Sequence, residues 1–485
     1  VFAELAGREV INLPNGELGD QAPTAKDTDT EGALGLPDLV SVGLDYSPVM
    51  EQVQAQLESA LSHVRQSRAD LLPKLSLRNA RGPEHTTTVG TANDHTTRSQ
   101  TLALAQPIIN LPVVYAWMAD LSTHQAAEWR HAAGRESVSQ SVANAVVALA
   151  ASRVVLDYAD EQLHDFNQLL DYVQARSAAG VVSQSEVERA RTRVLAARQS
   201  RIDQQASYRN ALLEIERLTG VMPKSLKLPY LNQLPGLPLT LGDIRNLVRE
   251  NNPSLRALRA DVESQEKTVV SEYGKMLPAL GLSIEKDKTE NIRGINPIVE
   301  DRRVMAVLTW DLSLGGKEFY AGRGASSELV NRQAKLKEET ERTLQGTDSD
   351  FFLLQSATLR ITSAEEEQRA AAAVVAATRE QLKNGRLNSL LDALDAVDRH
   401  FSARQRLTQA LAQQMQAQTQ LLGRIGILGD LSNYSTVKLA AAPEAAATDS
   451  QVQLPASGKE SVQSSEHAAD EAKRATSNQS STEKR

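Results

Sequence analysis

The sequence repeats itself at a nearly constant spacing. "SPVMEQVQAQLES" at residues 47–59 is matched by "NPSLRALRADVES" at 252–264, and "LLPKLSL" at 71–77 is matched by "MLPALGL" at 276–282, both 205 residues later. "GVVSQSEV" at 180–187 matches "RLNSLLDA" at 386–393, and Gly220 matches Gly426, both 206 residues later. Because separate landmarks keep one spacing, the sequence predicts two structural repeats built on one plan.

Each repeat contains a long stretch without proline that has helical periodicity. From Val138 to Val173, apolar or small residues recur at alternating spacings of four and three, which is the pattern of a coiled-coil seam. The pattern resumes after Gly180, so residues 113–218 predict a helical hairpin that reverses there. Residues 317–428 predict the second hairpin, with its reversal at Gly385. At 1.5 Å per residue each long helix would span roughly 100 Å.

Two short segments in each repeat alternate apolar and polar residues, which is typical of strands with one apolar face. They predict a β-hairpin at residues 73–110 and another at 278–314. Four strands cannot close a transmembrane barrel, for which about eight is the minimum, so a membrane role requires an oligomer. Three copies would supply twelve strands. The alternating apolar positions are Leu75, Leu77, Leu102 and Leu104, then Leu280, Leu282, Ile284, Val304, Ala306, Leu308 and Trp310.

Aromatic residues lie where the predicted strands meet the predicted helices. An aromatic belt would occupy this position in a bilayer protein, whereas core packing in a soluble sheet is the alternative interpretation. The five residues are Tyr115, Trp117, Tyr273, Trp310 and Tyr320.

The composition argues against several other classes of protein. The chain has no cysteine, which excludes disulfides, zinc–cysteine sites and thiol catalysis. Its net charge of −8 argues against a nucleic-acid partner. No run of 18 apolar residues occurs, so the sequence predicts no membrane-spanning helix. The initial "VFA" fits the end of a signal peptide. No nucleophile and base can be paired by position, and we predict neither a cofactor nor enzymatic activity.

The pattern as a whole resembles the TolC family of outer-membrane export proteins over roughly residues 45–430. The resemblance is carried by "LLPKLSL", "LALAQPIINL", "AAGVVSQSEVERA", "LTG", "MLPALGL", "VLTWDLSLGG" and "NSLLDALDA". It implies a mainly α-helical chain with a membrane β-barrel: long antiparallel coiled-coil helices form an α-barrel, and four strands per chain complete a 12-stranded barrel in a homotrimer. The trimer would lie in the outer membrane of a Gram-negative bacterium, contact its lipid and extend a helical tunnel through the periplasm.

These patterns divide the chain into four parts. Residues 1–44 predict an extended N-terminal arm, residues 45–235 the first repeat and residues 236–430 the second. Residues 431–485 are rich in Ala, Ser, Glu, Lys and Gln and predict a disordered tail.

The second reversal carries the candidate functional residues. Asp392 and Asp395 match the pair of aspartates that forms an acidic ring at the periplasmic entrance of the family, and Glu186 stands at the equivalent place in the first repeat. A solvated helix face is the alternative, and we assign Asp398 to such a surface. The family latches its entrance with Arg and Tyr contacts. Here the corresponding positions are Asn388 and Lys383, with Arg386 nearby, so the latch departs from the family's pattern.

Three motifs suggest metal or phosphate sites only weakly. Residues 27–38, "DTDTEGALGLPD", fit a calcium-loop template, but Gly and Pro surround them and favour a flexible linker. His85 and His95 lie in a predicted loop and are not assigned to a metal. "GGKEFYAGRG" at 315–324 lacks the Lys-Ser/Thr ending of a phosphate loop.

The sequence therefore predicts an outer-membrane exit duct for type I protein secretion. It would dock to a periplasmic adaptor and an inner-membrane ABC transporter. Many drug-efflux ducts carry a lipidated N-terminal Cys that is absent here, which favours protein secretion over small-molecule or multidrug efflux. A soluble coiled-coil scaffold is the alternative of a different class, although a scaffold needs neither the strands nor the aromatic junctions.

Overall fold

Long helices make up most of the computed structural model, which describes residues 10–12, 34–88, 91–227, 236–238, 240–292, 298–386 and 389–430. In the first half, α3 (Pro48–Ala69), α4 (Leu111–Ala178) and α5 (Gln184–Thr219) contain 22, 68 and 36 residues. In the second half, α7 (Pro253–Gly274), α8 (Lys317–Lys383) and α9 (Leu390–Ile425) contain 22, 67 and 36. The order and the lengths of the helices are therefore almost the same in both halves.

A short helix precedes each half: α2 (Leu36–Tyr46) and α6 (Leu241–Asn251), both of 11 residues. Each is followed by a residue that caps the next helix, Ser47 before α3 and Asn252 before α7. Residues 36–44, which we predicted to belong to an extended arm, are therefore helical. The prediction was wrong there because Leu36, Leu39 and Val40 are buried in the main core.

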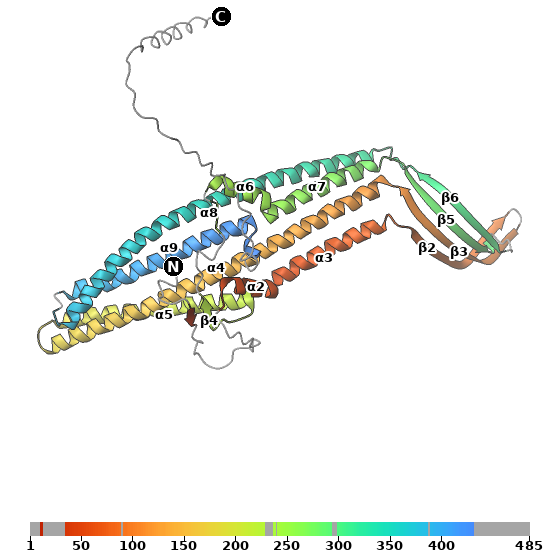
Figure 1. Ribbon diagram of the computed structural model, residues 1–485. Helices are drawn as coiled ribbons and strands as arrows, with labels where there is room; N and C mark the ends of the chain where they lie inside the picture. Colours follow the sequence, from red (N-terminus) through yellow and green to blue (C-terminus); the bar gives the residue numbers. More distant parts are fainter. Residues whose placement is uncertain are drawn as a thin grey trace, which may run out of the picture. The chain divides into compact units, whose positions relative to one another are not determined.

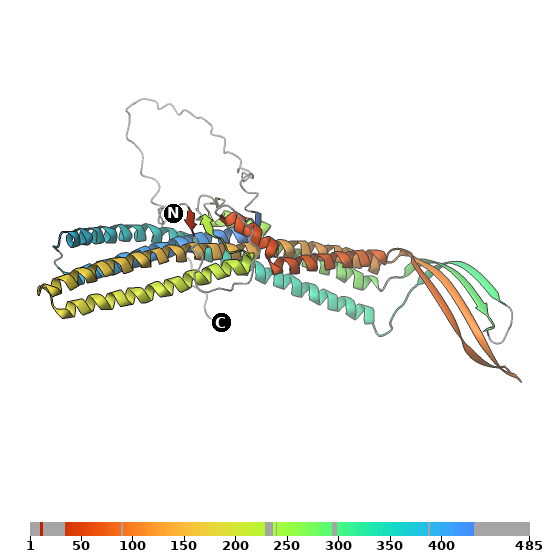
Figure 2. The same cartoon turned by 90° about the horizontal axis from the view of Figure 1, so that it is seen from below.

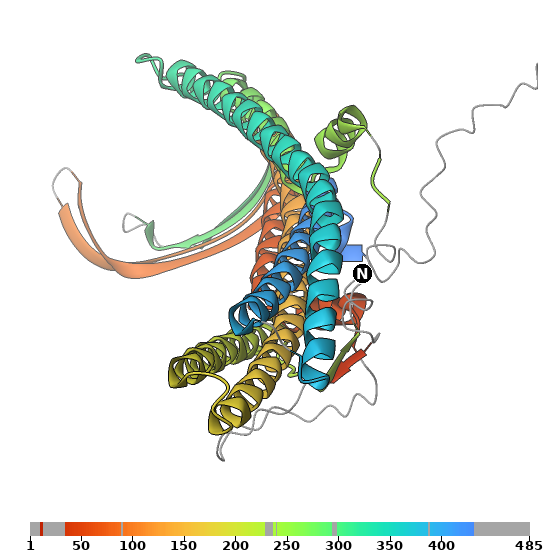
Figure 3. The same ribbon diagram turned by 90° about the vertical axis from the view of Figure 1, so that its left-hand side faces the viewer.

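The helices lie side by side in two overlapping layers of contact (Figures 1 and 2). Near the sheet the order is α3, α4, α7, α8, and toward the helix reversals it is α5, α4, α9, α8. Figure 3 shows these helices end-on. α4 and its neighbours α7 and α9 thus form the middle of the array. Among the described residues, α3 and α5 form one edge and α8 forms the other.

A four-stranded antiparallel sheet extends from one end of the helices (Figure 1). It consists of β2 (Lys74–Thr88), β3 (Thr91–Ile109), β5 (Ala279–Glu290) and β6 (Val299–Thr309), in the order β2-β3-β5-β6. The central pair, β3 with β5, joins the two halves of the chain. Within the described residues, β2 and β6 each pair on one side only. A second, two-stranded sheet pairs β1 (Val10–Asn12) with β4 (Ser225–Lys227).

The seam predicted from the 4-and-3 spacing is confirmed in the helical core. Of its members in α4, Val142, Leu149 and Ala159 have no exposed surface. α4 also contains an 18-residue window with a mean hydropathy of 1.4, so by length and composition this one described helix could cross a membrane. Our exclusion of any such helix was therefore too strong, because it counted only uninterrupted apolar runs. Two thirds of that window, 67%, are buried inside the protein.

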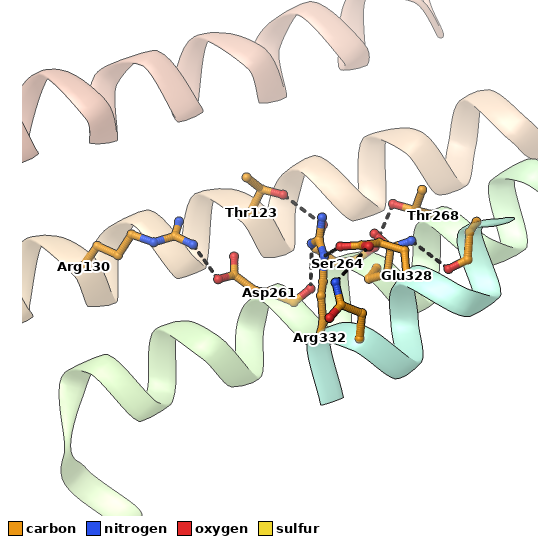
Figure 4. Close-up of polar contacts among 10 residues, drawn as sticks. Thr123, Arg130, Asp261, Ser264, Thr268, Glu328 and Arg332 are labelled. Carbon is orange, nitrogen blue, oxygen red and sulfur yellow. Dashed lines mark hydrogen bonds and ion pairs between the residues drawn. The ribbon is translucent and has the colours of Figure 1, made fainter. Parts of the chain in front are cut away.

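Polar contacts bind α4 to α7 and α8 near the sheet (Figure 4). Arg130 on α4 contacts Asp261 on α7 at 2.5 Å, and Arg332 on α8 donates to the Asp261 carbonyl at 3.2 Å. The hydroxyls of Thr123 and Ser264 are 2.9 Å apart. Such short side chains allow α4 and α7 to approach closely, and their hydrogen bonds leave few polar groups unsatisfied between them.

Candidate functional site

The strand register gathers the predicted apolar positions on one face of the sheet. Leu75 lies opposite Leu104, which lies opposite Ile284, and Ile284 lies opposite Val304. Since side chains two residues apart share a face, Leu77, Leu102, Leu280, Leu282, Ala306 and Leu308 belong to the same face. Leu75, Leu77, Val304 and Leu308 are 68–75% exposed. This is a continuous apolar surface across all four strands.

The opposite face of the sheet is polar. At neighbouring positions it carries Ser76, Glu285 and Arg303, and Arg303 pairs with Asp287 on the adjacent strand. A sheet that is apolar on one face and charged on the other separates lipid from water.

The five aromatic residues divide into two groups. Trp310 and Tyr320 are 60% and 65% exposed where the second hairpin meets α8. Trp310 donates its indole N–H to the Met276 carbonyl at 3.1 Å. Tyr115, Trp117 and Tyr273 are partly buried among the helices.

Both helical hairpins reverse at a glycine in the left-handed conformation. Gly180 has φ of +74° and Gly385 has φ of +65°, values that suit glycine because it has no Cβ. After each glycine the next N–H bonds back to a carbonyl five residues earlier, from Val181 to Arg176 and from Arg386 to Gln381. These bonds satisfy carbonyls that the helix end leaves free.

The predicted acidic residues lie at the start of the two return helices. Ser389 caps α9 by accepting a hydrogen bond from the Asp392 N–H, and the Asp392 side chain is exposed. Asp395 pairs with Arg399 one turn later at 2.8 Å. Glu186 lies in the first turn of α5. The geometry thus leaves Asp392 directed to solvent and partly neutralises Asp395.

A pocket of about 290 Å³ brings the two reversals together. Glu186 and Arg189 line it from α5, Arg176 and Tyr172 line it from α4, and Ser389 lines it with the first leucines of α9. Arg176 donates to the Tyr172 hydroxyl at 2.7 Å. Glu186 therefore faces two arginines at this pocket, while Asp392 is not among its lining residues.

Asp398, which we assigned to a solvated surface, is instead half-buried. It pairs with Arg193 of α5 at 2.7 Å and accepts a hydrogen bond from Gln162 of α4 at 3.0 Å. Burial raises the pKa of Asp398, while Arg193 opposes the rise. The prediction was wrong because helical spacing alone does not reveal that two other helices converge on this face of α9.

An ionic layer above the tip links α4, α8 and α9; we define it as Glu161, Asp165, Arg379 and Arg404. Arg379 donates to Glu161 at 2.8 Å and to both oxygens of Asp165. Arg404 also bonds to Glu161, and its guanidinium lies 3.6 Å over the Tyr158 ring. Burial would raise the pKa of Glu161, but the two arginines outweigh it and hold the pKa at about 2. The sequence gave no sign of this layer beyond charged residues beside the seam.

A second polar cluster holds the end of α9 against the middle of α4. The carboxylate of Glu136 accepts the N–H groups of Leu428 and Gly429 at 3.0 and 3.1 Å. Arg135 pairs with Asp430 at 2.6 Å. Burial raises the pKa of Glu136 to about 7 despite these hydrogen bonds.

The remaining predicted residues do not assemble into a site. Arg386 is exposed, as is Lys383, and Asn388 lies outside the described residues. His85 and His95 pair with Asp94 and Glu84 across the β2–β3 hairpin. The described residues contain no group of three or more metal-ligating side chains. Most of the calcium-like segment and all of the predicted tail also lie outside the description.

Comparison with known families supplies the identity of this architecture. The model of the family described as outer membrane efflux protein matches residues 39–221 and 244–426. The chain belongs to the outer membrane efflux protein family. It is therefore an outer-membrane exit duct with a helical periplasmic part, and its family consists of channel proteins rather than enzymes. Membership also implies that it works with adaptors and inner-membrane transporters.

Individual relatives are distant but match over most of their length. The chain is 24% identical to the alkaline protease secretion protein AprF of Pseudomonas aeruginosa, over 82% of this chain and 85% of that protein. It is 23% identical to the proteases secretion protein PrtF of Dickeya chrysanthemi, over 82% and 89%. The solved structure of the outer-membrane channel OprN has the same fold, with a TM-score of 0.72 at 18% identity, over 81% and 89%.

Proposed function

We propose that three copies of the chain close into a ring that forms the exit duct of a type I protein secretion system. The observation that carries this proposal is the pair of open sheet edges. Unpaired strand edges that present free N–H and C=O groups are rarely left exposed. Joining β6 of one copy to β2 of the next removes every such edge, and three copies supply the twelve strands of a barrel.

The apolar face of the sheet supports placing this barrel in the outer membrane. Within a bilayer every backbone polar group must be bonded inside the protein, and a closed barrel achieves this. The face that contains Leu75, Leu282 and Leu308 would then contact lipid, and the face with Glu285 and Arg303 would line water. Trp310 and Tyr320 are exposed at the helix-proximal margin of this face, which suits an aromatic belt. The duplicated order of helices and strands is, on this proposal, a structural repeat at 45–235 and 236–430.

The far end of the helices would form the periplasmic entrance. In a ring, the three copies of Asp392, supplemented by Asp395 and Glu186, would surround one opening. Rings of carboxylates attract cations and disfavour anions. We therefore propose that this rim is cation-selective, with Arg386 close enough to the reversal to influence its width. The pocket between the reversals adds arginines to the outer side of the same rim.

The relatives favour protein as the cargo. AprF and PrtF are both protease secretion proteins, and each matches more than four fifths of this chain. By this likeness the chain would dock to a periplasmic adaptor and an ABC transporter, and it would export a protein. Small-molecule efflux is the alternative that the family's description keeps open.

Deletion of the gene tests the proposal with two readouts. We expect one or more proteins to disappear from the culture medium while drug susceptibility stays unchanged. Complementation with the intact chain should restore them, and the chain should be recovered from outer membranes as a heat-sensitive trimer. Intact secretion together with raised drug susceptibility would contradict the protein-export proposal and favour efflux.

A further inference from the structure

Apolar side chains are exposed along the two edge helices. On α5 they recur at spacings of 7 and 11 residues, and on α8 at spacings of 7 and 15, so each set forms one stripe. The α5 stripe contains Leu195, Ile202 and Leu213, which are 50–56% exposed, and the α8 stripe contains Phe352, Leu359 and Val374, which are 55–74% exposed. Such regular stripes indicate helix faces that are meant to be covered.

The equivalent positions in the other half of the chain are already covered. α5 begins at Gln184 and α9 at Leu390, so equivalent positions in these helices are 206 residues apart. The counterparts of Ile202 and Leu213 are Thr408 and Thr419, which have no exposed surface. The same comparison between α8 and α4 uses the 205-residue interval between Gly385 and Gly180. The counterparts of the α8 stripe are Val147, Val154 and Leu169, which are at most 2% exposed.

The contact that covers these counterparts is the seam between α9 and α4. Thr419 on α9 accepts a hydrogen bond from Gln140 on α4 at 3.3 Å. Further toward the tip, Arg404 on α9 bonds to Glu161 on α4. In the ring, the neighbour of α9 is α4 of the same chain, whereas the neighbour of α5 is α8 of the next chain. The two seams are therefore equivalent in the repeat.

The charged pair of the known seam has an unused counterpart on the two edges. Arg404 corresponds to Arg198 on α5, and Glu161 corresponds to Glu366 on α8. Both side chains are exposed, and no ion pair forms at either of them among the described residues. The two edges thus offer opposite charges and apolar stripes in the same arrangement as the α4–α9 seam.

We propose that α5 of one copy packs along α8 of the next copy as α9 packs along α4, with Arg198 paired to Glu366 of the neighbouring copy. The inference rests on the proposed ring and adds the register of its helical seams. A second copy is the occupant because both complementary edges belong to one chain, and because the template for their packing lies inside that chain. Ile202 and Leu213 then lie in the new seam.

Cysteine cross-linking tests the register cleanly, because the chain has no cysteine of its own. The trimer carrying Arg198→Cys and Glu366→Cys is treated with a short bismaleimide and analysed on a denaturing gel. The control trimer carries Arg198→Cys and Gln381→Cys, because Gln381 is an exposed residue roughly 22 Å further along α8. We expect covalent dimers and trimers from the first variant and none from the second.

The outcomes separate this inference from the proposed function. If trimers form but the 198–366 pair does not cross-link, the register is wrong while the ring stands. If no variant or wild-type chain forms a trimer, the ring itself is wrong.

Charge reversal gives a second measurement. Arg198→Glu or Glu366→Arg alone should lower the fraction of intact trimer in mild detergent about two- to fivefold, and both changes in one chain should restore it. Arg342→Glu, an exposed reversal on α8, is the matched control and should change little. Failure of the double variant to recover would overturn the pairing.

Discussion

The guanidinium of Arg379 on α8 donates to both carboxylate oxygens of Asp165 on α4, at 3.0 and 2.6 Å. α9 lies between these helices in the array, so the long arginine side chain spans a neighbour to connect the two coiled-coil hairpins. Only 8% of the Asp165 side chain is exposed. The pair therefore joins the two hairpins close to the end where the candidate entrance lies.

Arg379→Ala should destabilise this end of the helices. It leaves Asp165 buried without its cation, which costs about 1–3 kcal/mol after allowing for the partial exposure of Arg379. We expect a lower melting temperature of the trimer and a higher ion conductance in planar bilayers, because the hairpins are less firmly joined. Arg360→Ala is the control, since Arg360 makes one exposed hydrogen bond to Gln413. Equal effects of the two substitutions would argue against a special role for Arg379.

Neutralising the proposed rim should change selectivity rather than stability. The Asp392→Asn, Asp395→Asn double variant should lose cation preference and sensitivity to block by multivalent cations. Its trimer should melt close to the wild-type temperature, because Asp392 is exposed and Asp395 bonds only to Arg399. Asp398→Asn is the contrasting variant, which should lower stability by removing the ion pair to Arg193. Unchanged selectivity in correctly inserted double-variant trimers would leave the aspartates as a solvated helix face.

A cation on the apolar face of the sheet should hinder membrane insertion. Leu282→Arg places a charge beside Ala306, and such a change costs roughly 2–4 kcal/mol at the middle of a bilayer. Ser283→Arg is matched in position but points to the other face of the sheet, so it should insert normally. The amount of heat-sensitive trimer in outer-membrane fractions measures both. Equal insertion of the two variants would show that this face does not contact lipid.

Glu136 should make stability depend on pH near neutrality. Its pKa is raised to about 7, above the ordinary 4.5, so the stabilisation it contributes is complete below about pH 4.5 and is lost as pH rises through 7. Glu136→Gln cannot ionise, so the melting temperature of this variant should fall less than that of wild type between pH 5 and pH 8. At pH 5 the variant should be slightly less stable, because glutamine offers one oxygen to the two N–H groups. Parallel melting curves across this range would contradict the assignment.

Local patterns in the sequence were sufficient for much of the architecture. The 4-and-3 spacing around Leu149 predicted a buried seam because coiled-coil packing depends on residues that are close in sequence. Gly180 and Gly385 predicted the reversals because few other residues adopt a positive φ. Alternation around Leu282 predicted strands with one apolar face. Periodicity and backbone preference are local properties, so they can be obtained without knowing which elements are neighbours.

The contacts between distant elements were decided only by the tertiary structure. No local signal indicates that β3 pairs with β5, that Asp398 meets Arg193, or that Arg379 reaches Asp165, because these partners are more than a hundred residues apart. α2 was missed for a related reason: its few apolar residues become a helix face only when the core that buries them exists. The sequence by itself determined the elements and their repeated order. The packing of one half against the other determined which charges are paired, and it left the edges α5 and α8 uncovered.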